Sequence, residues 1–217
     1  MQDYLYSTIG LIAIRALPGG DTVPTDAACQ RGRFSLARLC PWNHPSGIHG
    51  GTDDVMNDYT HIKRNFGPVY DAASEILILG SFPSVKSREA AFFYGHPRNR
   101  FWSLMGRILA REIPPDPAGK KALMLEEHVA LWDVIEECDI IGSSDSSIRN
   151  VVPVDIMKLL GTADVRKIYC NGATSFKLFL KYLAPVCGRT PVKLPSTSPA
   201  NAALSLDRLY DEWKIIR

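Results

Sequence analysis

The chain has 217 residues, of which 46% are hydrophobic and 22% charged, and its formal net charge is +2. This length suffices for one sizeable α/β domain with a tail, and the composition is that of an ordinary globular protein. No apolar run approaches the roughly 18 residues that a bilayer span requires, and no cationic stretch precedes the apolar segment 9–17. Neither a transmembrane helix nor a secretory signal is therefore expected.

Residues 1–55 are rich in Gly, Pro, Asp, Thr and Ser and show no sustained periodicity, so we predict a poorly ordered extension. Met56 opens the region that reads as a folded domain, residues 56–217. We hypothesise that Met56 is the functional start of the protein and that the preceding segment is either poorly ordered or an annotation artefact. N-terminal sequencing of the native protein decides this, because a mature start at Met1 removes the second alternative.

The rest of the chain alternates between apolar strand-like runs and segments with helical spacing. Four short strands separated by helices predict a three-layer α/β/α fold with a central four-stranded parallel sheet. The strands are expected at 75–79, 129–134, 166–170 and 191–194, and the longer helices at 99–110, 120–128 and 202–216. A Ser/Asp-rich loop (142–150) precedes a short helix with Pro153 near its first turn and Gly161 past its end, and a further helix runs from Gly172 until Pro185 closes it.

Each predicted strand is followed by a polar or Gly/Pro-rich turn. The turns are Gly80–Pro83, Trp132–Asp133, Asn171–Gly172 and Pro195–Ser198. Because the carboxyl ends of parallel strands meet at one edge of a sheet, these turns are expected to assemble a pocket there.

The segment 86–111 combines basic and aromatic residues. Its six cations face a single acid, Glu89, which leaves an excess of about five positive charges, the footprint of a modest DNA-binding face. The cations are Lys86, Arg88, Arg98, Arg100, Arg107 and Arg111. Cations beside aromatic rings suit the binding of phosphates and an unstacked base. For Arg107 and Arg111, a solvated helix surface is the alternative interpretation.

The five cysteines form an odd set without a CxxC pair, which predicts reduced thiols in a cytoplasmic protein. Cys170 lies in an apolar strand and is expected to be buried. Cys29, Cys40, His44 and His49 do not have the spacing of a standard zinc finger. No metal is therefore expected, and no organic cofactor is indicated, since the GxxxxGK[ST] pattern of a phosphate-binding loop is absent.

Three motifs resemble a known family. GSFPS (80–84), YGHPRNRFW (94–102) and LPSTSPAN (194–201) are similar to motifs of the uracil-DNA glycosylase superfamily, and most like those of its DNA-deoxyinosine (hypoxanthine-DNA) glycosylase branch. The resemblance covers roughly residues 63–217. It implies an enzyme of base-excision repair that removes deaminated bases from DNA, with hypoxanthine as the first substrate to test.

The first motif departs from the better-known branches of that superfamily. Its third residue is usually an Asp or Asn that positions the attacking water, whereas here it is Phe82, which cannot orient water by hydrogen bonding. The resemblance points to Asn99 of the HPRN sequence as the substitute, because an amide carbonyl can accept from a water while its NH2 group is anchored. Alternatively Asn99 caps the helix that follows, and both roles can hold together.

The other predicted contacts divide into two groups. Base binding is assigned to Ser81, Phe82, Tyr94, Asp133 and Asn171, with Phe82 as a pocket wall, Tyr94 or Phe93 as the stacking ring, and Asp133 and Asn171 reading the base edge. DNA binding is assigned to Ser84, Lys86, His96, Arg98, Arg100, Ser196, Ser198 and Asn201. The alternatives are core packing for the aromatics, turn formation for Asp133 and Asn171, a structural His96, and a capping role for Asn201 on the last helix.

No Lys occupies an evident nucleophile position in these motifs, so a monofunctional glycosylase is expected. We expect it to act as a monomer on DNA containing a deaminated base, without a membrane partner. One alternative is a uracil or G:U/G:T mismatch glycosylase of the same fold. Another is a catalytically silent nucleic-acid-binding module, which Phe82 favours.

Overall fold

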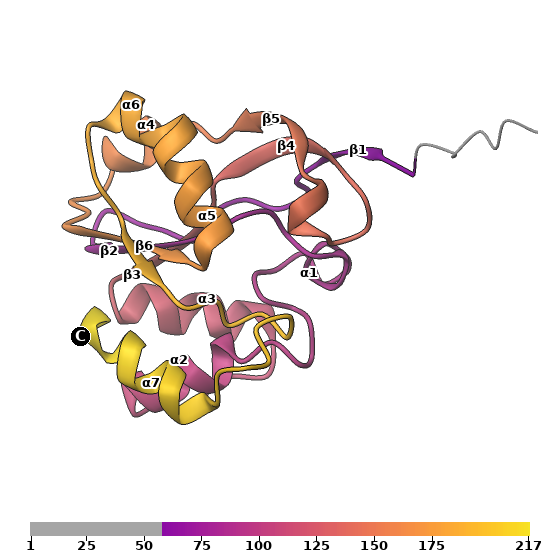
Figure 1. Cartoon of the computed structure of the whole chain (residues 1–217). Helices are drawn as coiled ribbons and strands as arrows, with labels where there is room; N and C mark the ends of the chain where they lie inside the picture. Colours follow the sequence, from indigo (N-terminus) through magenta and orange to yellow (C-terminus); the bar gives the residue numbers. More distant parts are fainter. Residues whose placement is uncertain (1–57) are drawn as a thin grey trace, which may run out of the picture. The chain divides into compact units, whose positions relative to one another are not determined.

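The structure is a computed structural model, and it describes residues 58–217 (Figure 1). The expectations for residues 1–55, for a start at Met56 and for the lack of a zinc site at Cys29, Cys40, His44 and His49 lie outside the described residues. Within residues 58–217, no helix is both long and apolar enough to cross a bilayer.

A four-stranded parallel sheet lies at the centre of the domain, in the order β3-β2-β6-β7. Its strands are β2 (Ile76–Gly80), β3 (Val129–Asp133), β6 (Lys167–Asn171) and β7 (Val192–Leu194). This confirms the predicted fold class and all four predicted strands. Leu77, Ile78 and Leu79 of β2 are fully buried, because helices cover both faces of the sheet.

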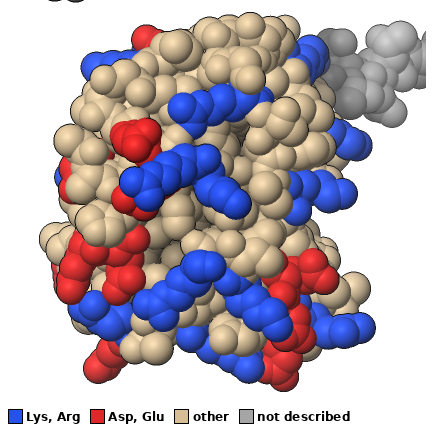
Figure 2. Space-filling model, turned by 90° about the vertical axis from the view of Figure 1, so that its left-hand side faces the viewer, with Lys and Arg blue, Asp and Glu red and all other residues tan. Residues whose placement is uncertain are grey.

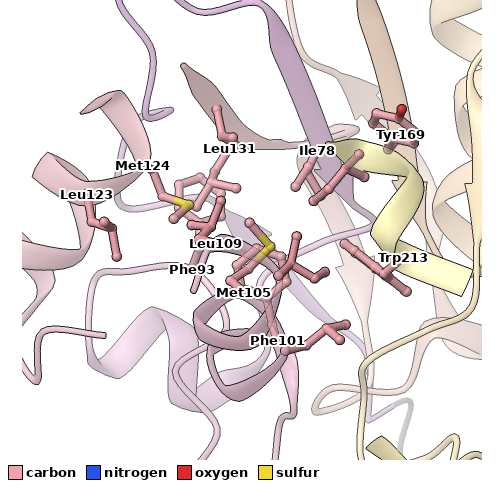
Figure 3. Close-up of a cluster of buried hydrophobic side chains, with 14 of the residues drawn as sticks. Ile78, Phe93, Phe101, Met105, Leu109, Leu123, Met124, Leu131, Tyr169 and Trp213 are labelled. Atoms are coloured by element: carbon pink, nitrogen blue, oxygen red, sulfur yellow. The ribbon is translucent and has the colours of Figure 1, made fainter. Parts of the chain in front are cut away.

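One face of the sheet is covered by α2 (Phe101–Leu109), α3 (Pro117–Glu126) and α7 (Leu206–Trp213), the last continuing into a 3-10 turn, Lys214–Ile216 (Figure 1). Ile78 and Leu131 of the sheet, Met105 of α2 and Trp213 of α7 pack into the core on this side (Figure 3). The ends of α2 and α3 follow local rules. Ala110 ends α2 in a left-handed conformation, and Asp116 caps α3 by accepting a hydrogen bond from the backbone N–H of Gly119.

The other face carries α4 (Ile156–Leu160), α5 (Ala173–Leu178) and α6 (Ala184–Cys187). The expectation that Pro185 closes the helix after Gly172 was wrong. A π-helical turn, Phe179–Leu183, links α5 to α6, and Pro185 lies in the first turn of α6, where its missing N–H costs nothing. Cys170 is fully buried on this side, as predicted.

A second, antiparallel sheet was not predicted. It contains β1 (Thr60–Lys63), β4 (Ile135–Ile140) and β5 (Arg149–Pro153), in the order β1-β4-β5. Pro153 therefore ends a strand rather than starting a helix, and α4 begins later, capped by Asp155. The strands of this sheet carry many charged residues, such as Lys63 and Glu137, which form a cross-strand ion pair of 2.6 Å. The alternation of apolar and polar residues that predicts a half-buried strand is therefore weak in these strands, and the sequence did not reveal them.

Candidate active site

The predicted turns line a single cavity of about 390 Å³ at the carboxyl ends of the parallel strands, the end at which α1 (Val85–Glu89) lies in Figure 1. Ser81, Asp133, Asn171 and Ser196 come from the four turns, and Asn99 joins them from the segment before α2. The convergence arises because parallel strands end at the same edge of the sheet.

Asn99 lines the cavity and lies one residue before the N-cap of α2, a position that Arg100 occupies, so the helix cap expected of Asn99 is not formed in its ordinary place. Its Oδ1 accepts a hydrogen bond of 3.0 Å from the backbone N–H of Phe101. The amide is thus anchored through its carbonyl, not through its NH2 group as the sequence reasoning had assumed. Both N–H donors and the second lone pair of Oδ1 have no partner among the described residues, so this end of the amide can bind a water or a ligand.

Arg100 ties the loop 195–204 to the start of α2. Its guanidinium donates to the backbone carbonyls of Leu204, Ser198 (3.1 Å) and Asn201 (2.8 Å). Its own backbone N–H donates to the carbonyl of Thr197 at 3.1 Å. The arrangement is that of a side chain positioning a loop, and these contacts compete with any contact to a phosphate.

Within that loop, side chains fold back on the backbone. Ser196 Oγ accepts from the N–H of Ser198 at 3.2 Å, and Ser198 Oγ accepts from the N–H of Ala200 at 3.3 Å. Both hydroxyl protons therefore remain available at the cavity. Asn201 donates through Nδ2 to the carbonyl of Ser196 at 2.8 Å. The alternative that Asn201 caps the last helix was wrong, since Ser205 caps α7.

Asn171 is held by two hydrogen bonds to Thr197, a buried residue to which the sequence analysis assigned no role. Its Oδ1 accepts from the N–H of Thr197, and its Nδ2 donates to Oγ1 of the same residue, both at 2.9 Å. One N–H and one lone pair of the amide remain for a ligand in the cavity, beside the Tyr94 hydroxyl, whose pKa burial raises and the Asn171 amide lowers. The two hydrogen bonds fix the plane of the amide, because it is held at both ends.

Asp133 stands at the end of β3, paired in register with Gly80 of β2. It is 4% exposed and lines the cavity, and neither carboxyl oxygen has a hydrogen-bond partner among the described residues. A Cβ on Gly80 would lie only 2.3 Å from its Oδ1, so this position requires glycine. Burial raises the pKa of Asp133 to about 7, with Arg64 opposing this and Asp145 and Glu136 adding to it.

The aromatic residues have separate roles. Tyr94 stacks on Phe101, with ring centroids 3.8 Å apart, and its backbone is left-handed at φ 54°. The Tyr94 hydroxyl is buried without a hydrogen-bond partner, and burial raises its pKa far above the ordinary range. Phe93 belongs to the core and also lines the cavity, and Phe82 is a buried cavity wall beneath the Arg88 guanidinium. One face of the Tyr94 ring is thus covered by protein.

A wall of the cavity comes from the turn Asp145–Ser147 and the residues before it, which the sequence analysis treated only as a connecting loop. Ser81 Oγ donates to Asp145 Oδ1 at 2.9 Å. Partial burial raises the pKa of Asp145, while the hydroxyls of Ser81 and Thr174 lower it. The run of Ser and Asp side chains was the signal that could have placed this loop at the site.

Two predicted DNA contacts lie on α1. Ser84 caps this helix by accepting from the N–H of Ser87 at 3.2 Å, and it also lines the cavity. Lys86 is exposed and pairs with Glu89 at 2.7 Å. An exposed pair of this kind contributes little to stability, so Lys86 remains able to exchange its partner.

His96 and Arg98 lie in the turn before Asn99 and are not among the residues that line the cavity. His96 Nδ1 accepts from the N–H of Arg98 at 3.1 Å, which gives this histidine a structural contact. The exposed Arg98 guanidinium makes no ion pair or hydrogen bond within residues 58–217. It is therefore available for a phosphate.

The distribution of Lys and Arg side chains does not by itself distinguish the cavity end of the molecule from its other faces. Arg107 pairs with Asp207, and Arg111 pairs with Glu126 at 3.0 Å, so both act as surface residues of the fold. Figure 2 shows the left-hand side of Figure 1, and this face also carries many Lys and Arg side chains with Asp and Glu among them.

Comparison with known proteins finds relatives of this chain. No family model matches the chain. A hypoxanthine DNA glycosylase of Methanosarcina acetivorans is 34% identical over 157 residues, which are 71% of this chain and 98% of the relative. A hypoxanthine DNA glycosylase of Methanosarcina barkeri is 36% identical over 89 residues, 41% of this chain and 56% of that protein.

A solved structure agrees with these relatives. The solution NMR structure of a protein from Methanosarcina acetivorans, named as a candidate uracil DNA glycosylase, superposes with a TM-score of 0.62 at 32% identity and covers 72% of this chain and 96% of its own. The fold, the motifs at the cavity and the near-complete coverage of a relative agree. The chain belongs to the uracil-DNA glycosylase superfamily, in its hypoxanthine-DNA glycosylase branch.

Proposed function

We propose that this protein is a monofunctional DNA glycosylase that hydrolyses the N-glycosidic bond of a deaminated base, with hypoxanthine as its first substrate, in base-excision repair. The observation that carries the proposal is that Asn99 faces the same cavity as Asp133 and Asn171. A group able to orient water and groups able to read a base edge thus share one enclosed space.

The target base must leave the helix stack to reach this cavity. The remaining N–H and lone pair of Asn171 match the O6 and N1–H of hypoxanthine, and the fixed amide plane makes this match directional. Asn99 would hold the attacking water at C1′ through its free lone pair and N–H groups. An amide orients this water without deprotonating it, which suffices when the base departs early from an oxocarbenium-like sugar.

The residues that line the cavity include no Lys within the described part of the chain. A lyase step through a Schiff base would require such an amine. The expected product is therefore an intact strand with an abasic site.

We infer that the DNA backbone is held by the free Arg98 guanidinium and by the hydroxyls of Ser196 and Ser198 in the loop that Arg100 fixes. A loop that is already ordered loses little conformational entropy on binding. The proposed partner is DNA with a deaminated base, bound by a monomer in the cytoplasm.

Uracil is the second candidate substrate, because the similar solved structure is named as a candidate uracil DNA glycosylase. The test uses duplexes that carry one hypoxanthine, uracil, xanthine or G:T mismatch, followed by alkali cleavage. Product from the hypoxanthine duplex supports the proposal, and product from the uracil duplex alone supports the second candidate. If no duplex gives product although the protein binds it, the chain is a silent binding module and both proposals are wrong.

A further inference from the structure

The Asp133 carboxyl is buried at the proposed site and has no hydrogen-bond partner there. Its side chain faces the cavity from the end of β3, and no hydrogen-bond partner meets it among the described residues. Buried carboxyl groups are ordinarily paired, because an unpaired charge in this environment is strongly destabilising. An arrangement that leaves Asp133 unpaired thus needs an explanation in the function of the site.

The neighbouring backbone gives the carboxyl its space. Gly80 lies opposite Asp133 in the sheet, and a Cβ there would be 2.3 Å from Asp133 Oδ1 and 3.8 Å from the Tyr94 hydroxyl oxygen. The glycine of the first motif therefore leaves room for a carboxyl group at the cavity floor.

The charged and titratable groups around Asp133 favour its neutral form. Arg64, after β1, is the opposing cation, but it pairs with Glu136 of β4 at 2.6 Å. Asp145 of the cavity wall and Glu136 both repel a second negative charge. The Tyr94 hydroxyl is neutral at any ordinary pH, so it supplies no charge. Burial therefore outweighs the single cation and raises the pKa of the Asp133 carboxyl to about 7.

The cavity also lacks a cation for a departing base. Among the described residues that line it, there are two carboxyl groups, Asp133 and Asp145, and no Lys, Arg or His. A base that left as an anion would enter this negative environment without compensation. A base that takes up a proton leaves as a neutral molecule.

On the premise of the proposed function, we propose that Asp133 is the catalytic acid that protonates the departing hypoxanthine. The C1′–N9 bond breaks and its electron pair stays with N9, while the Asp133 carboxyl gives its proton to a ring nitrogen of the base. The water held by Asn99 then forms the C1′–O bond and loses one proton to solvent. Solvent returns a proton to the Asp133 carboxylate, so charge and atoms balance.

The test measures single-turnover excision of hypoxanthine from duplex DNA between about pH 5 and pH 9, with the wild type, Asp133→Asn and Asp145→Asn. The wild-type rate is expected to fall about tenfold per pH unit above about pH 7. Asp133→Asn should lose this pH dependence and lower the maximal rate by about 10²–10⁴-fold, with DNA affinity retained. Asp145→Asn should keep the fall but move it to lower pH, because a repelling charge is gone.

Three results would overturn the inference: a flat wild-type profile, an Asp133→Asn variant that keeps the wild-type fall, or one whose rate is within about threefold of wild type. The wild-type profile decides the question even if the variant does not fold. Failure of the wild type to release any base would instead reject the proposed function, and with it the premise.

Discussion

The Asp133 carboxyl should make the fold less stable as the pH rises. Its pKa is about 7 in the folded protein, against an ordinary value of 3.8. Between these values the folded state holds a proton that the unfolded state has lost, so the free energy of unfolding falls with increasing pH. At roughly 1.4 kcal/mol per pKa unit, the difference amounts to about 4 kcal/mol between acid and neutral pH. The stabilisation is complete below about pH 4 and is lost as the pH passes 7.

Asp133→Asn isolates this effect. The amide brings its own desolvation cost, but that cost does not change with pH, and the other titrating groups are common to both proteins. Urea unfolding of the wild type and the variant at about pH 4, 6 and 8 gives the free energy of unfolding of each. The variant should gain about 4 kcal/mol relative to the wild type between the lowest and the highest pH. Parallel stability curves over this range would refute the argument, because they would show that Asp133 ionises normally.

Three further predictions concern neighbouring residues. Asn99→Ala should lower the rate of hypoxanthine excision by at least about 10²-fold with DNA affinity retained, whereas an unchanged rate would remove Asn99 from the mechanism. Gly80→Ala should destabilise the fold by about 1–3 kcal/mol in thermal unfolding, because the new methyl carbon would lie 2.3 Å from a carboxyl oxygen, while Gly67→Ala, with open space around it, serves as the control. Arg98→Ala should weaken DNA binding and reduce the salt slope of the binding constant by about 1, whereas Arg100→Ala should mainly reduce the excision rate and leave that slope nearly unchanged. Equal salt slopes for the two arginine variants would contradict the distinction between them.

The parallel sheet could be predicted because its inner strand β2 and its neighbour β3 are apolar on both faces and because turn residues follow each strand, whereas the edge strand β7 is short and mostly exposed. Leu77, Ile78 and Leu79 are an example, since a short continuous apolar run is typical of a strand that is buried on both faces of a parallel sheet. The antiparallel sheet could not be found in the same way. Its strands carry Lys63, Glu137 and similar residues that pair with one another across strands, and such pairs become visible only when the register is known.

At the site, the motifs identified the segments but not the contacts of each side chain. Adjacent residues show the difference: Arg98 is free, whereas Arg100 donates to carbonyls about a hundred residues further along the chain. Thr197 and Asp145 were missed because their importance depends on partners from distant elements, Asn171 and Ser81. Residue type and spacing carry no information about such long-range pairs.

The bonds from the Arg100 guanidinium have a consequence for how this site can change over evolutionary time. They join the segment that follows YGHP to the segment that follows LPST, which lie far apart in the chain. The acceptors are backbone carbonyls, which any sequence supplies, but a segment from a divergent homologue would place them under the guanidinium only if its loop had the same length and conformation. A chimera that took the other segment without its arginine would leave these carbonyls without their donor. The two segments should therefore be inherited, and transplanted in protein engineering, as a single unit.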